Sequence, residues 1–411
     1  MRILFISNKV FPSTDANGKI IENIGRELQK EYNIESDYLT MTIKENFERD
    51  SNPIEEYNIE GHDILQINPP YFTYKNHFNE NKNLIDLLKT LTFIAIRRCS
   101  YGKIDKWLIS LVNKFISKKD YECIIFVSNP HKAAYLINRV KSNAKKMWFM
   151  LDPFTNNVIL SPTSNKLNLL LEKSIYKHID SVFMPNLIYN ENKEKQIFKY
   201  KDKMHTYQFP NIIENNNIGK DKTFSTEHIT IVFVGFLYPD IRNPKYFLDL
   251  LCNSNSKIQL YIVGGTWGKF EDGFFEKYQE LLGDRFKILG KKNTEECAQI
   301  LNQADILLNI GNSIPNMIPS KIFEYISTGK PILNVCKLDN CPTLVYMEKY
   351  DNCLNLFESE GIDAQQVEQF EKFCFTSIGK RIPFEQIKDT YKEATLEYVV
   401  KQLLDEAMKK N

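Results

Sequence analysis

The segment "IPSKIFEYISTGKPIL" (318–333) brings together groups that can bind a phosphorylated ligand. Its pattern predicts a helix between two strands, and Pro319 and Ser320 are typical of a helix start. Ser320 and Lys321 precede Glu324 by four and three residues, so the three side chains share one side of the helix. A lysine offers phosphate a point charge, and a carboxylate one turn into the helix could accept two hydrogen bonds from a ribose diol. The alternative is a solvated Lys321–Glu324 ion pair, which would contribute little.

Short apolar runs alternate with amphipathic stretches of helical length along the whole chain. Such runs, rich in Val, Ile and Leu, are typical of parallel sheets covered on both faces, so we predict an α/β fold. The predicted strands are 2–7, 63–67, 123–128, 147–151, 181–185, 229–235, 258–265, 286–290, 305–310 and 331–335. The predicted helices are 19–32, 243–252, 272–282, 294–303 and 319–328, with a long one inside 82–118.

The chain of 411 residues is longer than one hydrophobic core usually supports, so two domains are expected. The polar segment 210–228 is the predicted linker. We expect one doubly wound Rossmann-like domain at 1–212, a second at 213–385, and a C-terminal helix at 386–411 that packs back on the first. The carboxyl ends of the strands, where such sheets bind ligands, would face each other across a cleft.

Residues 229–335 resemble one known family in the order of their motifs. "PSKIFEYISTGKPIL" is similar to the nucleotide-sugar signature of the group 1 glycosyltransferases of the GT-B fold. "VFVGFLYPDIRN", "YIVGG" and "ILGKKNTEECAQILNQADILLN" precede it in the family's order. The resemblance implies that Glu324 binds the ribose of a nucleotide-sugar donor, and that Ser320 and Lys321 lie near its diphosphate, close to the glycine that ends the first strand, Gly235.

Two positions of the second domain differ from the family pattern. Asn316 stands where many members carry a first glutamate that contacts the donor sugar, and Phe236 follows Gly235 where many have an arginine. The diphosphate still needs opposing cations, so Arg242 joins Lys321 as a candidate, with a surface loop arginine as the alternative. In the first domain, the family's glycine-rich loop corresponds to Asn17-Gly18, and Gly18 would permit close backbone approach or serve only as a turn.

Three polar residues of the first domain are candidate catalytic groups. Asp15 falls in the first loop, His131 follows the strand 123–128, and Asp152 follows the strand 147–151. An acceptor hydroxyl needs a general base if the reaction inverts stereochemistry, and a carboxylate or a histidine at the end of a strand could serve. If stereochemistry is retained, the resemblance implies that no such base is required. Each residue also has an ordinary alternative, as a loop, helix-start or turn residue.

Composition narrows the class of protein. Lys and Arg total 53 against 52 Asp and Glu, so no global charge points to nucleic acid. Eight scattered cysteines are typical of reduced thiols in a cytoplasmic protein, and the nearest pair, Cys336 and Cys341, is interpreted as incidental. The start "MRILFISNKVF" has no signal-peptide pattern, and no apolar run approaches the roughly 20 residues that span a bilayer.

Residues 82–119 contain nine Lys or Arg against two Asp, interleaved with Leu, Ile, Phe and Trp107. Basic amphipathic helices suit an anionic membrane surface, so peripheral contact with the inner membrane surface is one expectation. The alternative is two ordinary helices whose apolar stripes face the core of the first domain.

The leading hypothesis is a bacterial glycosyltransferase of the hexosyltransferase type. It would move a sugar from a nucleotide diphosphate-sugar to a hydroxyl of a saccharide or lipid-linked acceptor, in surface polysaccharide or glycolipid assembly. We expect no cofactor and no metal ion, because the sequence has no DxD-like pair of acids. The alternatives are a nucleotide-sugar epimerase or hydrolase of the same fold, and a non-catalytic binding protein whose donor site has decayed.

Overall fold

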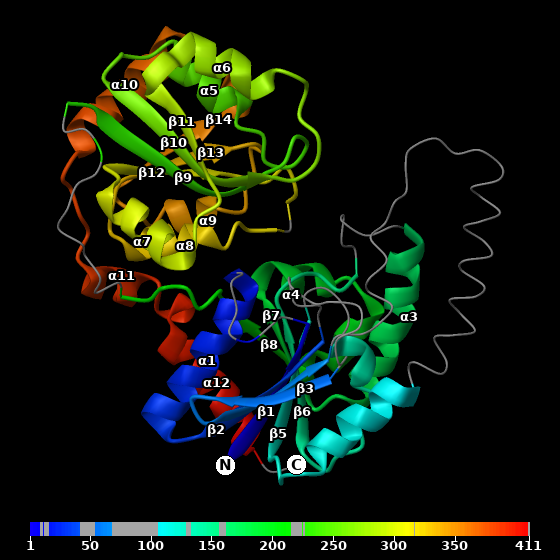
Figure 1. Ribbon diagram of the computed structural model, residues 1–411. Helices are drawn as coiled ribbons and strands as arrows, with labels where there is room; N and C mark the ends of the chain where they lie inside the picture. The colour runs from blue at the N-terminus through cyan, green and yellow to red at the C-terminus, as the bar shows by residue number, and fades with distance from the viewer. Residues whose placement is uncertain are drawn as a thin grey trace. The chain divides into compact units, whose positions relative to one another are not determined.

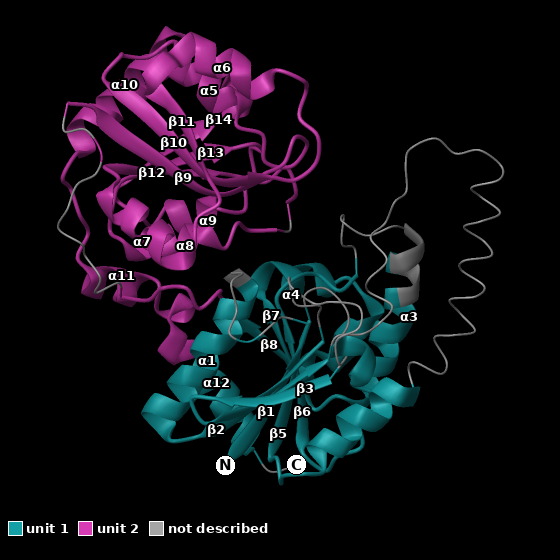
Figure 2. Cartoon of the chain, in the orientation of Figure 1, with its two compact units in different colours: residues 1–207, 400–411 teal, residues 208–399 magenta. Residues whose placement is uncertain are grey.

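The computed structural model describes residues 1–8, 11, 16–41, 54–67, 106–128, 133–155, 162–214, 224, 227–315 and 317–409. Contacts divide the chain into two compact units (Figure 2). Unit 1 comprises Met1–Tyr207 with Val400–Asn411, and unit 2 comprises Gln208–Val399.

Unit 1 is built on an eight-stranded sheet in the order β3-β4-β2-β1-β5-β6-β7-β8 (Figure 1). The paired strands run parallel, apart from the antiparallel pair β3 and β4. The sequence predicts β1, β5 and β7 with their observed bounds. The strands are β1 (Arg2–Ser7), β2 (Glu35–Thr40), β3 (Ile54–Ile59), β4 (His62–Ile67), β5 (Cys123–Ser128), β6 (Lys145–Met150), β7 (Ser181–Pro185) and β8 (Met204–Tyr207).

Helices of unit 1 bury large apolar side chains. They are α1 (Ala16–Tyr32), a helix over 106–116, α3 (Pro162–His178), α4 (Asn186–Asn192) and the later part of α12 (Leu396–Met408), with short 3₁₀ turns at Ala133–Leu136 and Gln196–Lys203. Near the end of α12, the Nζ atom of Lys145 lies 2.6 Å from the carbonyl oxygen of Glu406 and 3.2 Å from its carboxylate.

Strand β2 was missed by the sequence analysis because its first half is polar, "ESD". Asp37 is 1% exposed in the core, and its carboxylate accepts hydrogen bonds from Lys119 (2.9 Å), Tyr121 (2.8 Å) and Arg2 (3.3 Å). A buried charge is tolerated when it is paired and hydrogen-bonded. The partners that make this strand possible therefore come from distant parts of the chain.

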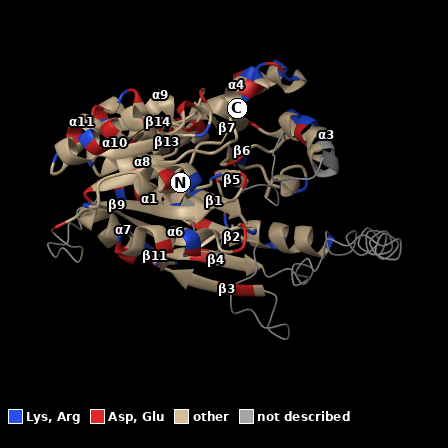
Figure 3. Ribbon diagram, turned by 90° about the horizontal axis from the view of Figure 1, so that it is seen from above, with Lys and Arg blue, Asp and Glu red and all other residues tan. Residues whose placement is uncertain are grey.

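The basic segment 82–119 lies partly outside the described residues. In its described part, Leu108, Val112, Phe115 and Ile116 are buried in the core of unit 1. The apolar stripe of 106–116 therefore covers the sheet, as the ordinary alternative expects, and membrane contact stays a prediction. Among the described residues, no helix is both long and apolar enough to cross a bilayer. Charges of both signs occur along single helices, as on α10 and α11, which belong to unit 2 (Figure 3).

Unit 2 has a six-stranded, parallel sheet in the order β11-β10-β9-β12-β13-β14. The strands are β9 (Ile229–Leu237), β10 (Ile258–Thr266), β11 (Phe286–Gly290), β12 (Ile306–Ile310), β13 (Ile332–Cys336) and β14 (Cys353–Phe357). The chain runs outward from β9 through β10 to β11, then returns to add β12, β13 and β14 on the other side of β9. The strand order thus reverses between β9 and β12, and doubly wound sheets bind ligands beyond the carboxyl ends of the strands at such a point.

Helices cover both faces of this second sheet (Figure 1). One face carries α5 (Lys245–Cys252), α6 (Phe274–Leu282) and α10 (Ala364–Ser377), and the other carries α7 (Thr294–Gln303), α8 (Lys321–Ser327) and α9 (Leu344–Met347). The helix α11 (Phe384–Thr390) follows. The prediction of an α/β chain with two parallel-sheet domains is confirmed.

Candidate functional site

Two glycines meet where β9 and β10 approach their carboxyl ends. Gly235 and Gly264 are partners in the parallel register, and a Cβ atom at position 264 would lie 1.9 Å from the carbonyl oxygen of Gly235. Gly264 also has φ +135°, a conformation that side chains rarely permit. Only glycine fits at 264, because the backbone of Gly235 fills the space that a side chain would need.

Arg242 is fixed at the reversal of strand order. Its guanidinium donates two hydrogen bonds to Oδ1 of Asn312, from Nε (3.1 Å) and Nη2 (2.8 Å), and a weaker one to the carbonyl oxygen of Phe236 (3.4 Å). Backbone hydrogen bonds with Tyr238 in both directions hold the turn that carries it. Burial lowers the pKa of the guanidinium, which nevertheless stays charged in proteins. Arg242 is therefore an anchored cation of this edge, unlike the surface loop arginine of the alternative.

The helix α8 forms because its apolar residues share one buried side. Ile322, Phe323 and Ile326 are fully buried, as predicted, and so is Tyr325. The Tyr325 hydroxyl accepts a hydrogen bond from the backbone N–H of Val234 (2.8 Å). Because Val234 directly precedes Gly235, this bond ties α8 to the end of β9.

Lys321 and Glu324 form an ion pair on the less buried side of α8. Their side chains are 29% and 33% exposed, so a ligand can reach both. Ser320 occupies the position before the helix, but its side chain makes no capping bond. The Lys321–Glu324 ion pair that the alternative interpretation expects is thus present. It lies where a ligand could replace either partner.

Lys291, just after β11, is a further cation that sequence analysis missed. Its Nζ atom lies 5.4 Å from the centre of the Phe236 ring, and its Cε atom would be 3.3 Å from a Cβ atom at Gly265. The Phe236 ring lies against Gly265 as well. Only the pairing of β10 with β11 reveals this neighbourhood, since 55 positions separate Phe236 from Lys291 in the sequence.

The second half of the signature, "TGKP", is structural. Gly329 has φ +71°, and a Cβ atom there would lie 2.2 Å from the carbonyl oxygen of Ile382. The buried Lys330 donates hydrogen bonds from Nζ to the carbonyl oxygens of Asn302 (2.5 Å) and Ala304, at the end of α7. These residues hold α7, α8 and the following loops together, so the ligand-binding candidates are confined to the first half.

The other candidates divide between described and undescribed parts of the chain. Asp15, His131 and Asn316 lie outside the described residues. Gly18 was placed in a loop by the sequence analysis, and that placement is wrong: it is the third residue of α1 and is buried. Asp152 follows β6 in unit 1, two residues past the strand end, and is partly exposed.

Glu172 on α3 is a buried carboxyl group near the same loop, and sequence analysis missed it. The Thr155 hydroxyl donates a hydrogen bond to its Oε2 atom (3.1 Å), and the Lys195 ammonium donates to the Thr155 oxygen (3.2 Å). Burial raises the pKa of Glu172 to about 7, against the lowering effects of Lys195 and Thr155. Its position inside an amphipathic helix gave no signal, because nothing in the sequence shows which polar helix residues become buried.

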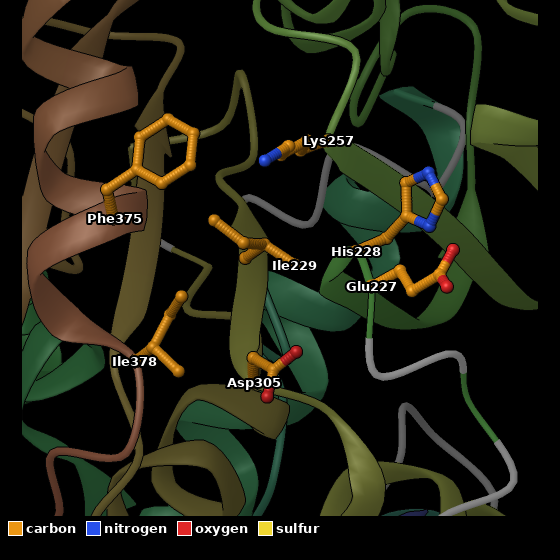
Figure 4. Close-up of a pocket in the computed structure, with 7 residues that line it drawn as sticks. All are labelled: Glu227, His228, Ile229, Lys257, Asp305, Phe375 and Ile378. Atoms are coloured by element: carbon orange, nitrogen blue, oxygen red, sulfur yellow. The ribbon is translucent and has the colours of Figure 1, made fainter.

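A pocket of about 220 Å³ in unit 2 lies at the opposite edge of its sheet (Figure 4). Ile229 starts β9, Lys257 directly precedes β10 and Asp305 directly precedes β12, so these residues mark the amino ends of the strands. Phe375 and Ile378 complete one wall. Parallel sheets bind ligands at their carboxyl ends, so this pocket is not the candidate site.

Comparison with solved structures supports the fold. The sucrose-phosphate synthase of Thermosynechococcus elongatus matches with a TM-score of 0.65 at 13% identity, covering 98% of each chain. The apo lipopolysaccharide outer core galactosyltransferase WaaB matches at 0.57 and 13%, covering 99% of each chain. Anabaena HepE in complex with UDP matches at 0.58 and 12%, covering 98% of this chain and 99% of HepE. No protein-family model and no curated protein matches the sequence. At these identities the likeness concerns the fold, and the chain has the GT-B fold that its sequence predicts.

Proposed function

We propose that this protein is a glycosyltransferase that moves a hexose from a nucleoside diphosphate-sugar to a hydroxyl acceptor. The observation that carries the proposal is the edge of unit 2 where β9 and β12 end. Two closely packed glycines, an anchored arginine and the Lys321–Glu324 pair belong to segments that meet there. This combination suits a ligand with a diphosphate and a diol.

Each group has a separate task in this proposal. Glu324 accepts hydrogen bonds from the ribose hydroxyls, and its release from Lys321 frees that ammonium for the diphosphate. Arg242, beside Gly235, and Lys291, beside Gly265, supply further positive charge. Since α8 has only seven residues, the cations rather than the helix N-terminus oppose the charge of the diphosphate.

The reaction breaks the bond between the anomeric carbon and the diphosphate oxygen and forms one to the acceptor oxygen. The acceptor proton passes to a base, for which Asp152 is the candidate in an inverting reaction, or to the departing diphosphate if stereochemistry is retained. Cations that stabilise the leaving diphosphate remove the need for a divalent metal ion. We therefore expect turnover to persist in EDTA.

The solved neighbours suggest which substrates to try first. HepE is described in complexes with UDP and with UDP-glucose, which favours a UDP-sugar as the donor. WaaB is a lipopolysaccharide galactosyltransferase, which favours a saccharide or lipid-linked acceptor in surface polysaccharide or glycolipid assembly. A cytoplasmic protein with peripheral membrane contact would fit such an acceptor.

Phe236 favours a second candidate function. It replaces the cation that the resemblance expects after Gly235, which is what a nucleotide-sugar-binding protein without catalysis would tolerate. Release of free nucleoside diphosphate separates the two functions, because a binding protein retains the donor intact. An epimerase or hydrolase would change the sugar without any acceptor.

Thermal unfolding against UDP-, GDP-, ADP- and CMP-sugars tests the donor site. A ligand at 100 times its Kd adds about 2.7 kcal/mol of stability, which shifts the midpoint by several degrees. We expect one nucleotide to stabilise the wild type and to lose most of this effect on Glu324→Ala. Glu280→Ala, an exposed glutamate on α6, is the matched control and should respond like the wild type. No shift with any donor would overturn the proposal.

A further inference from the structure

Cys336 and Cys341 lie together at the carboxyl edge of the unit 2 sheet. Cys336 is the last residue of β13, and Cys341 follows a four-residue turn. The two thiols are near enough for each to shift the pKa of the other, and they are 1% and 2% exposed. Asp339 and Asn340, inside the turn, are exposed, so the pair lies directly beneath a surface turn. The sequence analysis interpreted this pair as incidental, and its contact in the fold changes that interpretation.

The Thr343 hydroxyl lies 3.2 Å from the Cys341 sulfur, and either atom could donate this hydrogen bond. The same hydroxyl also donates to Oδ1 of Asn334 (3.1 Å). The neighbouring Cys336, followed by Thr343 and Lys337, lowers the pKa of Cys341 to about 6 against the effect of burial. The neighbouring Cys341 and burial raise the pKa of Cys336. Cys341 is therefore the more readily ionised thiol of the pair, and Cys336 keeps its proton more firmly.

This arrangement favours redox chemistry over metal binding. Among the residues that the structure describes, no group of three or more His, Cys, Asp or Glu side chains could hold a metal ion. A thiolate beside a thiol is instead the arrangement in which an oxidised sulfur is readily resolved to a disulfide.

The pair also touches the loop that holds the candidate site. A Cβ atom at Gly311 would lie 3.1 Å from the Cys341 sulfur, so the sulfur packs against that backbone. Gly311 donates its N–H to the carbonyl oxygen of Val335 (2.8 Å), one residue before Cys336. The next residue in the loop, Asn312, is the acceptor that fixes Arg242. The Cys341 sulfur is thus linked to Arg242 through two consecutive residues, Gly311 and Asn312.

We propose that Cys336 and Cys341 form a redox-sensitive dithiol that a peroxide converts to a disulfide, and that the disulfide weakens ligand binding at the adjacent site. In the first step the Cys341 thiolate attacks one peroxide oxygen, the O–O bond breaks, and a sulfenic acid and hydroxide form. The Cys336 sulfur then attacks the sulfenic sulfur, its proton leaves with the displaced hydroxyl group as water, and the S–S bond forms. The pair loses two electrons, the peroxide gains two, and with hydrogen peroxide one hydroxide ion and one water molecule result.

The first experiment measures the disulfide itself in the full-length protein. Native protein is treated with hydrogen peroxide, alkylated, digested and analysed by mass spectrometry, with and without later reduction by dithiothreitol. We expect a reducible cross-link between Cys336 and Cys341, absent in Cys336→Ser and retained in Cys297→Ser. In Cys336→Ser, a sulfenic-acid probe should label Cys341. If both thiols remain alkylatable after other cysteines have been oxidised, the dithiol proposal is overturned.

The second experiment measures the effect on the site and rests on the proposed function. The Kd of the stabilising nucleotide-sugar is compared between the reduced and oxidised protein. We expect a weakening of about fivefold on oxidation, absent in Cys336→Ser. An unchanged Kd despite the cross-link would refute the coupling. If the cross-link forms but the reduced protein binds no nucleotide-sugar, the donor site fails and the dithiol stands.

Discussion

Arg242 and Asn312 follow the two strands at which the sheet of unit 2 reverses its order, and two hydrogen bonds join their side chains. One side-chain oxygen therefore fixes the direction of the guanidinium and holds two loops together. An arginine that is ordered before a ligand arrives loses less entropy on binding than a mobile one.

The Asn312 side chain should matter more for ligand affinity than for folding. Asn312→Ala removes both hydrogen bonds, and also the one that its amide donates to the carbonyl oxygen of Met317 (3.0 Å). We expect the Kd of the nucleotide-sugar to rise about tenfold while stability falls by about 1–2 kcal/mol. Calorimetric titration and urea unfolding measure the two effects. Ser313→Ala is the matched control, because it removes a hydrogen bond to the carbonyl oxygen of Asp240 (2.8 Å) between the same loops without touching the guanidinium. Equal effects of the two variants would contradict the role of Arg242.

Lys291 and Lys292 offer a comparison between neighbouring lysines. Lys291 lies over the Phe236 ring at the site, whereas Lys292 pairs with Glu296 (3.3 Å). We expect Lys291→Ala to weaken binding of the nucleotide-sugar about five- to tenfold and to reduce its salt dependence, because one cation near the diphosphate is lost. Titrations at two salt concentrations should find Lys292→Ala close to the wild type. If both variants bind alike, Lys291 has no part in the site.

Substitution of Gly264 should reveal how tightly β9 and β10 approach. A methyl group at 264 would collide with the carbonyl oxygen of Gly235, so we expect Gly264→Ala to destabilise unit 2 by more than about 3 kcal/mol. Gly273→Ala has open space around the new Cβ atom and φ +78°, so it should cost only about 1–2 kcal/mol. Urea unfolding midpoints of the two variants give the difference. Similar midpoints would show that the strands can separate without cost.

The ionisation of Glu172 predicts a pH dependence of stability. In the folded protein it keeps its proton to about pH 7, whereas the unfolded chain releases it near 4.5. Between these values the folded state binds more protons, so the free energy of unfolding falls as pH rises. Glu172→Gln cannot ionise and can still accept the Thr155 hydrogen bond, so at pH 8 it should be more stable than the wild type by about 2–3 kcal/mol, and by little at pH 4.5.

Urea unfolding at pH 4.5, 6, 7 and 8 measures this difference. Glu194→Gln, at an exposed glutamate of the same unit, is the control and should change nothing across the range. A constant difference between Glu172→Gln and the wild type would mean that the carboxyl ionises as freely in the folded protein as in the unfolded chain.

Buried apolar strands were predictable because each is a continuous run of apolar residues in the sequence. The central strands β1, β5 and β9 are continuous apolar runs, and their predicted starts agree with the structure. The missed strands β2, β3, β8 and β14 are more polar or lie toward a sheet edge. In β2 the carboxylate of Asp37 is compensated by Arg2, Lys119 and Tyr121, and no local pattern contains those partners.

The candidate site follows the same division. Lys321 and Glu324 were predictable because they belong to one continuous segment. Arg242 was predictable because it follows Gly235 closely in the sequence. Lys291 and Glu172 were not, since the first depends on strand register and the second on which side of α3 is buried. Asn312 was missed for a similar reason: its task is to accept hydrogen bonds from a side chain 70 positions away.

The two halves of the signature segment are under different selection: the first half carries the ligand-binding candidates, and the second half, "TGKP", is structural. Gly329 and Lys330 contribute to the folding of unit 2 whether or not a ligand is ever bound. A descendant that has lost its activity would therefore keep "TGKP" as long as it still needs to fold. Lys321 and Glu324 lie on the less buried side of α8, and folding does not depend on them in the same way. Substitutions at these two positions would therefore accumulate. Among homologues, only the first half of the motif can therefore distinguish active enzymes from inactive ones.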